Sequence, residues 1–180
     1  KAAGNITPIY YSCKDAWSTQ LIPMLAWPAA VKADPEMPAK VSGNEMKFVD
    51  IPIFVASFDK LKEFRDKGYV NEDYLAATYD NAQKALVEGT AAMYPMGSWV
   101  MPTMADKFTA EQIDNIGAFV YPNDDNGDPW LCVLGSGGVY INQSTKNLDA
   151  AKLWMAFYTS PEGASEYYKI SKDIPVFNNV

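Results

Sequence analysis

Hydrophobic and polar positions follow two different periods along the chain, which predicts strands and helices in turn. Residues 5–12 and 90–96 are short apolar runs bounded by turn residues, as in buried strands. Residues 53–67 instead repeat apolar side chains every three or four positions, which is typical of an amphipathic helix. A further helix is expected from about residue 80 to Gly89. This alternation indicates an α/β fold.

Residues that start or stop helices place the remaining elements. Residues 15–27 are expected to form a helix with Asp15 as its N-cap, and Pro23 is expected to kink or interrupt it. Residues 28–52 contain several prolines and turn residues and predict a long loop. The other expected elements are a helix near 99–107 capped by Ser98, a strand at 115–121, two strand pieces around glycines within 131–142, and helices from residue 145 onward.

The composition narrows the possible chemistry. The chain of 180 residues has a formal net charge of −7, which repels a phosphate backbone, so nucleic-acid binding is not expected. It contains no histidine, which removes Ser-His-Asp and Cys-His catalytic sets and every zinc site that uses His. Cys13 and Cys132 either form one disulfide or stay as thiols. We therefore expect no metal, no cofactor and, since no apolar run is long enough, no transmembrane segment.

Two tryptophans stand at predicted helix starts. Trp17 follows Asp15, and Trp99 follows Ser98. At such a start, free backbone N–H groups and a polar side chain lie beside a flat aromatic ring. That arrangement suits a sugar, because the ring covers the apolar C–H face while the polar groups take the hydroxyls. Each ring could equally belong to the core, where tryptophan is usually buried.

The remaining candidates have different neighbours. Trp27 lacks polar neighbours and Trp154 lies on the apolar face of a predicted helix, so both are expected in the core. Trp130 lies in a predicted loop and is an intermediate case. The segment 135–138 has neither the dinucleotide fingerprint nor the lysine of a phosphate loop. Its glycines, Gly135, Gly137 and Gly138, are expected to form a hinge.

Several motifs of the chain resemble one family. They are "GNITPIYYSCKDAW", "VEGTAAMYPMGSW", "NIGAFVYP", "GSGGVYINQST" and "LDAAKLWMAFYTSPEGASEYYKISKDIPV". In this order they resemble the extracellular solute-binding proteins of bacterial ABC importers, the maltose-binding-protein-like family. The resemblance covers nearly the whole chain and is least secure over residues 28–52. It implies a two-lobed clamshell of α/β sandwich lobes with mixed sheets, of the periplasmic-binding-protein type II, with only the C-terminal part represented here.

The resemblance also implies a division of the chain and of its site. Residues 1–134 would form most of the C-terminal lobe, the strand at 135–142 would cross the hinge, and residues 143–180 would pack on an N-terminal lobe that is absent here. Trp99 matches the ligand-facing tryptophan of the family, and Trp17 stands where the family often has a stacking aromatic. Asp15 and Ser98 would be hydroxyl partners, with Trp130 as a third, weaker platform.

The function that the resemblance implies is binding of a carbohydrate in the cleft between the lobes and delivery to the permease subunits of an ABC transporter. The protein would be extracytoplasmic, in the periplasm or attached by a lipid, and would not be an enzyme. One alternative is a binding protein for a cationic ligand such as a polyamine, which aromatic rings and carboxylates would also hold. A second is a glycoside-active enzyme that uses paired carboxylates.

Overall fold

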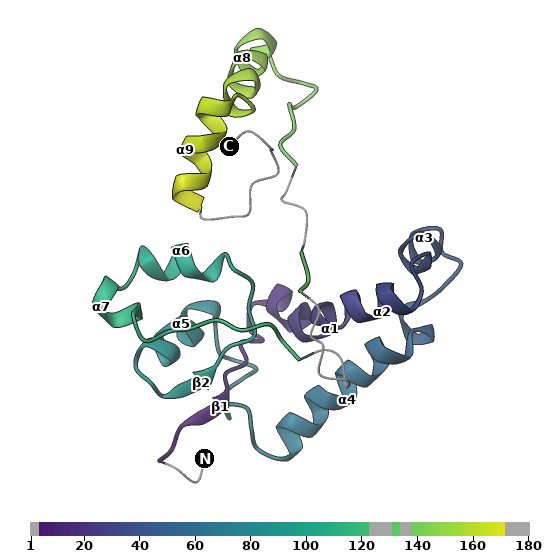
Figure 1. Cartoon of the computed structure of the whole chain (residues 1–180), viewed down its shortest axis with the longest axis vertical. Helices are drawn as coiled ribbons and strands as arrows, with labels where there is room; N and C mark the ends of the chain where they lie inside the picture. Colours follow the sequence, from purple (N-terminus) through teal and green to yellow (C-terminus); the bar gives the residue numbers. More distant parts are fainter. Residues whose placement is uncertain (1–3, 123–130, 134–137, 172–180) are drawn as a thin grey trace. The chain divides into compact units, whose positions relative to one another are not determined.

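The computed structural model describes residues 4–122, 131–133 and 138–171, which fall into two units (Figure 1). The first unit contains β1 (Thr7–Ile9), the 3-10 helix η1 (Ala16–Gln20), α1 (Leu21–Leu25), α2 (Trp27–Ala33), α3 (Met37–Ser42), the 3-10 helix η2 (Phe48–Asp50), α4 (Pro52–Asp66), α5 (Tyr79–Val87), β2 (Ala91–Met93) and α7 (Ala110–Ile113). The second unit contains α6 (Val100–Ala105), α8 (Leu148–Tyr158) and α9 (Pro161–Ser171). Helices therefore dominate a fold that keeps its parallel strands in the first unit.

A small parallel sheet organises the first unit. β1 pairs with β2, and Ile9 lies opposite Met93 in the register. On the other side, Ile9 also forms a parallel bridge with Val70, and its N–H donates to the carbonyl oxygen of Tyr69 at 3.0 Å. Three parallel segments thus end at the same edge. In open α/β folds, ligands bind at the carboxyl ends of such strands.

The loop expected over residues 28–52 is wrong, because this region forms α2, α3 and η2. The prolines mark helix starts: Pro28, Pro38 and Pro52 each stand at the first or second helical position. A helix has no acceptor for the N–H groups of its first turn, so the missing N–H of proline costs nothing there. Pro23 is tolerated in the first turn of α1 for the same reason, and the helix ends two residues later.

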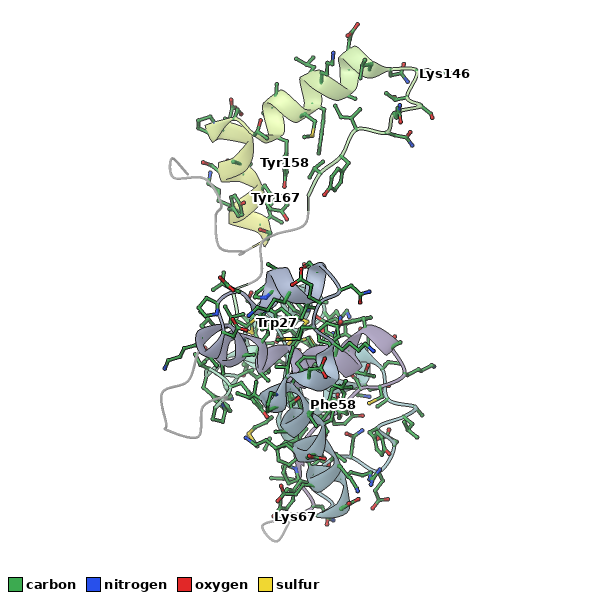
Figure 2. The ribbon with its side chains drawn as sticks, turned by 90° about the vertical axis from the view of Figure 1, so that its right-hand side faces the viewer. Trp27, Phe58, Lys67, Lys146, Tyr158 and Tyr167 are labelled. Atoms are coloured by element: carbon green, nitrogen blue, oxygen red, sulfur yellow. The ribbon has the colours of Figure 1, made fainter. Side chains whose placement is uncertain are left out.

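A helical core forms where α2, α3 and α4 meet. Its buried members are Ala30, Met37 and Ile51. Trp27 is partly buried and packs against this core, in agreement with the sequence prediction, and its ring meets that of Phe54 edge-on at 6.4 Å. Figure 2 shows Trp27 and Phe58 within this part of the first unit. The remaining apolar side chains packed against the core are Val31, Val41, Met46 and Ile53.

The two longer helices of the first unit agree closely with the sequence prediction. α4 spans Pro52–Asp66 and is followed by Gly68, whose φ of 64° is a left-handed conformation that glycine adopts without strain. α5 spans Tyr79–Val87 and is followed by Gly89, with a φ of 69°. In both cases the glycine lets the chain leave the helix and turn back to the sheet.

Three of the expected strands are absent from the described residues. Residues 116–122, 131–133 and 138–142 form no strand, whereas the sequence predicts strands at 115–121 and within 131–142. A strand exists only through hydrogen bonds to a neighbour, and the described residues offer none to these segments. The apolar pattern alone does not supply that partner.

The second unit holds a helical hairpin of α8 and α9. Ser160 caps α9, since its Oγ accepts the N–H of Gly163 at 3.1 Å. The rings of Tyr158 and Tyr167 meet edge-on at 5.4 Å between the helices, and Figure 2 shows both. Trp154 stacks on Tyr158 at 5.2 Å but is 54% exposed, so its assignment to the core is wrong. A pair of helices cannot enclose a large side chain on every side.

Candidate functional site

The segment that follows β1 is held at the carboxyl edge of the sheet. The N–H of Tyr10 donates to the carbonyl oxygen of Met93 at 2.8 Å, and that of Tyr11 donates to Oδ1 of Asn71 at 2.7 Å. Further along, the N–H of Cys13 donates to the carbonyl oxygen of Tyr74 at 2.8 Å. These bonds bring residues 10–15 alongside residues 71–77, and they lead the chain to the start of α5.

Asp15 reaches the start of α5 rather than capping its own helix. It precedes η1, as predicted, but its side chain makes no cap hydrogen bond there. Its Oδ2 instead accepts the N–H of Tyr79 at 2.6 Å. The carboxylate therefore lies at the positive end of the dipole of α5, where negative charge is stabilised.

Three aromatic side chains, which we call the aromatic row, follow from this arrangement. The rings of Trp17 and Tyr79 meet edge-on at 5.4 Å, and Tyr79 lies 6.4 Å from Tyr94. Trp17 is 42% exposed, whereas the two tyrosines are partly buried. The row thus presents one accessible ring that is backed by others, and a ring fixed in this way suits the apolar face of a ligand.

The inner end of the row is anchored to the segment that follows β1. The hydroxyls of Tyr94 and Ser12 share a hydrogen bond of 2.9 Å, and Ser12 is buried. Burial raises the pKa of the Tyr94 hydroxyl above its usual value, so this hydroxyl stays neutral at physiological pH. Sequence reasoning missed Tyr79 and Tyr94. Their signal is positional, because one opens α5 and the other directly follows β2.

Trp99 and Ser98, the other predicted helix-start pair, belong to the second unit. Trp99 is 38% exposed and is itself the N-cap of α6. The side-chain cap expected from Ser98 is therefore not formed, because Ser98 lies one residue too early. Its carbonyl oxygen accepts the N–H of Met101 instead, at 3.1 Å. That Trp99 contacts a ligand stays a prediction.

The remaining sequence candidates are only partly described. Trp130, Gly135 and Gly137 lie outside the described residues. Gly138 is described and lies in a segment without strand or helix. The hinge therefore stays a prediction.

The two cysteines are separate thiols. Cys13 and Cys132 are both free and partly buried, so the disulfide alternative is not formed. Burial raises the pKa of both thiols, which keeps them protonated and weakly reactive near neutral pH. Among the residues that the structure describes, no three His, Cys, Asp or Glu side chains are grouped to hold a metal ion.

A hollow lies beside α4. It has a volume of about 200 Å³ and is lined by Tyr11, Leu61, Lys62, Arg65, Val70 and Tyr74. Arg65 donates to Asp66 through two nitrogens, at 2.7 and 2.9 Å. Lys62 and Arg65 carry positive charge and would repel a cationic ligand such as a polyamine. This hollow therefore does not favour that class of ligand.

A comparison with known families shows which family the chain belongs to. The model of the bacterial extracellular solute-binding protein family matches residues 2–180. The chain belongs to this family. The resemblance that the motifs indicated is thus confirmed, and so is the α/β fold class.

Relatives of this solute-binding protein include proteins named for sugars. A multiple sugar-binding protein of Streptococcus mutans is 25% identical over 111 residues, which are 62% of this chain and 26% of that protein. The structure of a chitin oligosaccharide binding protein is similar with a TM-score of 0.67 and 27% identity, over 98% of this chain and 44% of that one. A sugar transporter of Bacillus licheniformis, solved with stachyose, has a TM-score of 0.63 over 99% of this chain and 46% of its own. At 15% identity it shows the fold alone. This chain spans less than half the length of these relatives.

Proposed function

We propose that this solute-binding protein binds a carbohydrate, a mono- or oligosaccharide, and delivers it to the permease of an ABC transporter. The observation that carries the proposal is the exposed ring of Trp17, backed by Tyr79 at the carboxyl edge of the parallel sheet. Membership of the family and relatives named for multiple sugars and chitin oligosaccharides support it.

The surroundings of Trp17 fit a neutral, hydroxylated ligand. Oδ2 of Asp15 is bonded to α5, whereas its Oδ1 accepts no hydrogen bond from the described residues. A sugar stacked on Trp17 would place a hydroxyl near that oxygen, and a carboxylate is a strong acceptor for O–H donors. Asp15 is accordingly proposed as a hydroxyl partner.

The rest of the site is proposed from the family resemblance. Trp99 and Ser98, and Trp130 as a weaker platform, would complete the contacts to the sugar. In the same proposal residues 1–134 form most of one lobe, 135–142 cross the hinge at Gly135–Gly138, and 143–180 pack on the other lobe. Closure of the lobes on the sugar would then create the surface that the permease recognises.

The proposal also includes an extracytoplasmic location and a function in binding without catalysis. The family is extracellular by description, so an extracytoplasmic position follows, and attachment by a lipid stays a prediction. In the described parts of the chain, no helix is both long and apolar enough to cross a membrane. The named relatives are binding proteins rather than enzymes.

A cationic ligand such as a polyamine is the second candidate. It is favoured by one observation, the carboxylate of Asp15 two residues from the exposed ring of Trp17. A ring and a carboxylate together attract an ammonium group. A glycoside-active enzyme is the third function that the sequence left open, and only measured turnover of a glycoside would support it.

Titration calorimetry on the full-length protein separates these candidates. The panel consists of a chitin tetrasaccharide, stachyose and spermidine. Trp17→Ala is expected to weaken binding of the sugar by about fivefold or more, because stacking contacts of this kind contribute about 1 kcal/mol or more each. Phe58→Ala is the matched control, since it removes another exposed ring of the same unit, on α4.

Three results would contradict the proposal. Sugar binding that is unchanged in Trp17→Ala would contradict the assignment of Trp17 to the binding site. Binding of spermidine but of no sugar would show that the ligand is cationic. Turnover of a glycoside would overturn the assignment as a binding protein.

A further inference from the structure

One carboxylate ties the segment of Trp17 to the start of α5. Asp15 Oδ2 accepts the N–H of Tyr79 at 2.6 Å, across 64 residues of sequence. Tyr79 is the first residue of α5, and its N–H is one of four that a helix leaves without an internal acceptor. The bond therefore satisfies the helix and also joins two distant segments of the unit.

Asp15 and Thr78 share the first turn of α5 without competing. Thr78 is the N-cap, and its Oγ1 accepts the N–H of Asn81 at 3.1 Å. In return, Oδ1 of Asn81 accepts the N–H of Thr78 at 2.9 Å, which closes a capping box. That box holds residues of one segment only. The bond from Asp15 is different, because it couples α5 to the chain that carries Trp17.

A tight turn transmits the position of Asp15 to Trp17. Both the N–H and the Oγ of Ser18 donate to the carbonyl oxygen of Asp15, at 2.9 and 2.8 Å. The same Oγ also donates to the carbonyl oxygen of Ser12, and Ser18 is buried. Trp17 lies inside this turn, so its backbone moves with Asp15. Its ring then meets Tyr79, the residue that Asp15 holds.

We propose that Asp15 is a positioning residue that orients the Trp17 ring against Tyr79 before a sugar arrives. The inference rests on the proposed function, in which Trp17 stacks on the sugar, and it adds a role that acts through Trp17. A ring ordered in advance reduces the entropy lost on binding, which raises affinity without a new contact to the ligand.

Three variants of the full-length protein test this role. Each is labelled with 5-fluorotryptophan for ¹⁹F NMR, and the Trp17 resonance is assigned with Trp17→Phe. Asp15→Ala is expected to shift or broaden that resonance in the sugar-free protein and to weaken chitin-tetrasaccharide binding by about tenfold. Asp15→Asn keeps an oxygen acceptor for the N–H of Tyr79, so it is expected to stay within about threefold of wild type.

Thr78→Ala is the matched control. It removes a cap from the same helix without touching the bond to Asp15. It is expected to lower the melting temperature about as much as Asp15→Ala. The shift and linewidth of the Trp17 resonance should stay as in wild type, and the sugar affinity should stay within about twofold.

Each other result has a definite meaning. A Trp17 resonance that changes equally in Thr78→Ala and Asp15→Ala would reduce the role to helix stability and overturn the inference. The inference would also be overturned if Asp15→Ala lowered the affinity for the sugar but left the Trp17 resonance unchanged, since Asp15 would then act only by contact with the sugar. If wild type binds no sugar, the proposed function fails, and the resonance of the sugar-free protein still decides the role of Asp15.

Discussion

At the scale of single residues, the hydroxyl of Tyr94 makes a bond whose loss can be measured. It shares a 2.9 Å hydrogen bond with Ser12, which is buried. Tyr94→Phe is expected to lower the free energy of unfolding by about 1 kcal/mol, because Ser12 loses its partner. Urea denaturation at pH 7 measures this loss. Tyr140→Phe is the control, since Tyr140 is 88% exposed and its hydroxyl should contribute nothing.

The same hydroxyl gives the variant a pH signature. Burial raises the pKa of folded Tyr94 above the unfolded value, so the protonated hydroxyl favours the folded state. This stability is fully present below the unfolded pKa, near pH 10, and is lost as pH rises toward the folded pKa. Wild type should therefore lose stability above pH 10 more steeply than Tyr94→Phe. Equal slopes would show that Tyr94 ionises in the folded state as freely as in the unfolded chain.

At this scale, the sequence was enough to select candidate residues, but it did not predict which distant residues they bond to. It selected Trp17 and Asp15 from their position at a helix start, and the structure places both at the carboxyl edge of the sheet. It placed Asp15 correctly before its helix, η1, but it did not predict that the carboxylate bonds to α5, because the bond to Tyr79 spans 64 residues and no local pattern contains it. Tyr94 was missed for the same reason, since its partner Ser12 is distant in sequence.

At the scale of elements, Gly163 sets how closely α9 approaches α8. A Cβ at this position would lie 2.2 Å from the carbonyl oxygen of Phe157 and 2.9 Å from its carbonyl carbon. Gly163→Ala must therefore displace backbone, which is expected to cost about 1–3 kcal/mol despite the better helix propensity of alanine. Amide hydrogen exchange across α9 would measure the loss of protection.

Ser165→Ala is the control for that experiment, because it also raises the helix propensity of α9, though by less, and places no new Cβ against backbone. Protection that is retained in Gly163→Ala would show that the hairpin adjusts without cost. Exchange that rises equally in both variants would place the effect outside the contact with Phe157.

Elements with complete local signals were predicted well. α4 and α5 carry helical periodicity and end at glycines with positive φ, and Ser160 caps α9 as expected. The loop over 28–52 was wrong because proline is read both as a helix breaker and as a first-turn residue. The absent strands failed for another reason, since pairing depends on a neighbour that the strand's own residues do not specify.

At the scale of the whole molecule, the second unit exposes an apolar helix face. Leu153 is 74% exposed, Trp154 54% and Phe157 52%, although all three belong to α8. Exposed apolar patches of this kind mark interaction surfaces. The proposed division of the chain places residues 143–180 against the other lobe of the clamshell, and this chain spans less than half of its relatives. That lobe is the partner we propose for this face.

Hydroxyl-radical footprinting read by mass spectrometry tests this arrangement. In residues 1–180 alone, Trp154 and Phe157 should be labelled in proportion to their exposure. In the full-length protein, their labelling should fall severalfold, because a lobe that packs on α8 excludes the radical along with water. Phe58 of α4 is a matched reference, since it is 52% exposed in the first unit and should be labelled equally in both. Labelling of Trp154 that persists in the full-length protein would contradict the proposed packing. A fall at Phe58 as large as that at Trp154 would mean that the added chain shields the protein generally, and would remove the assignment of α8 as the contact face.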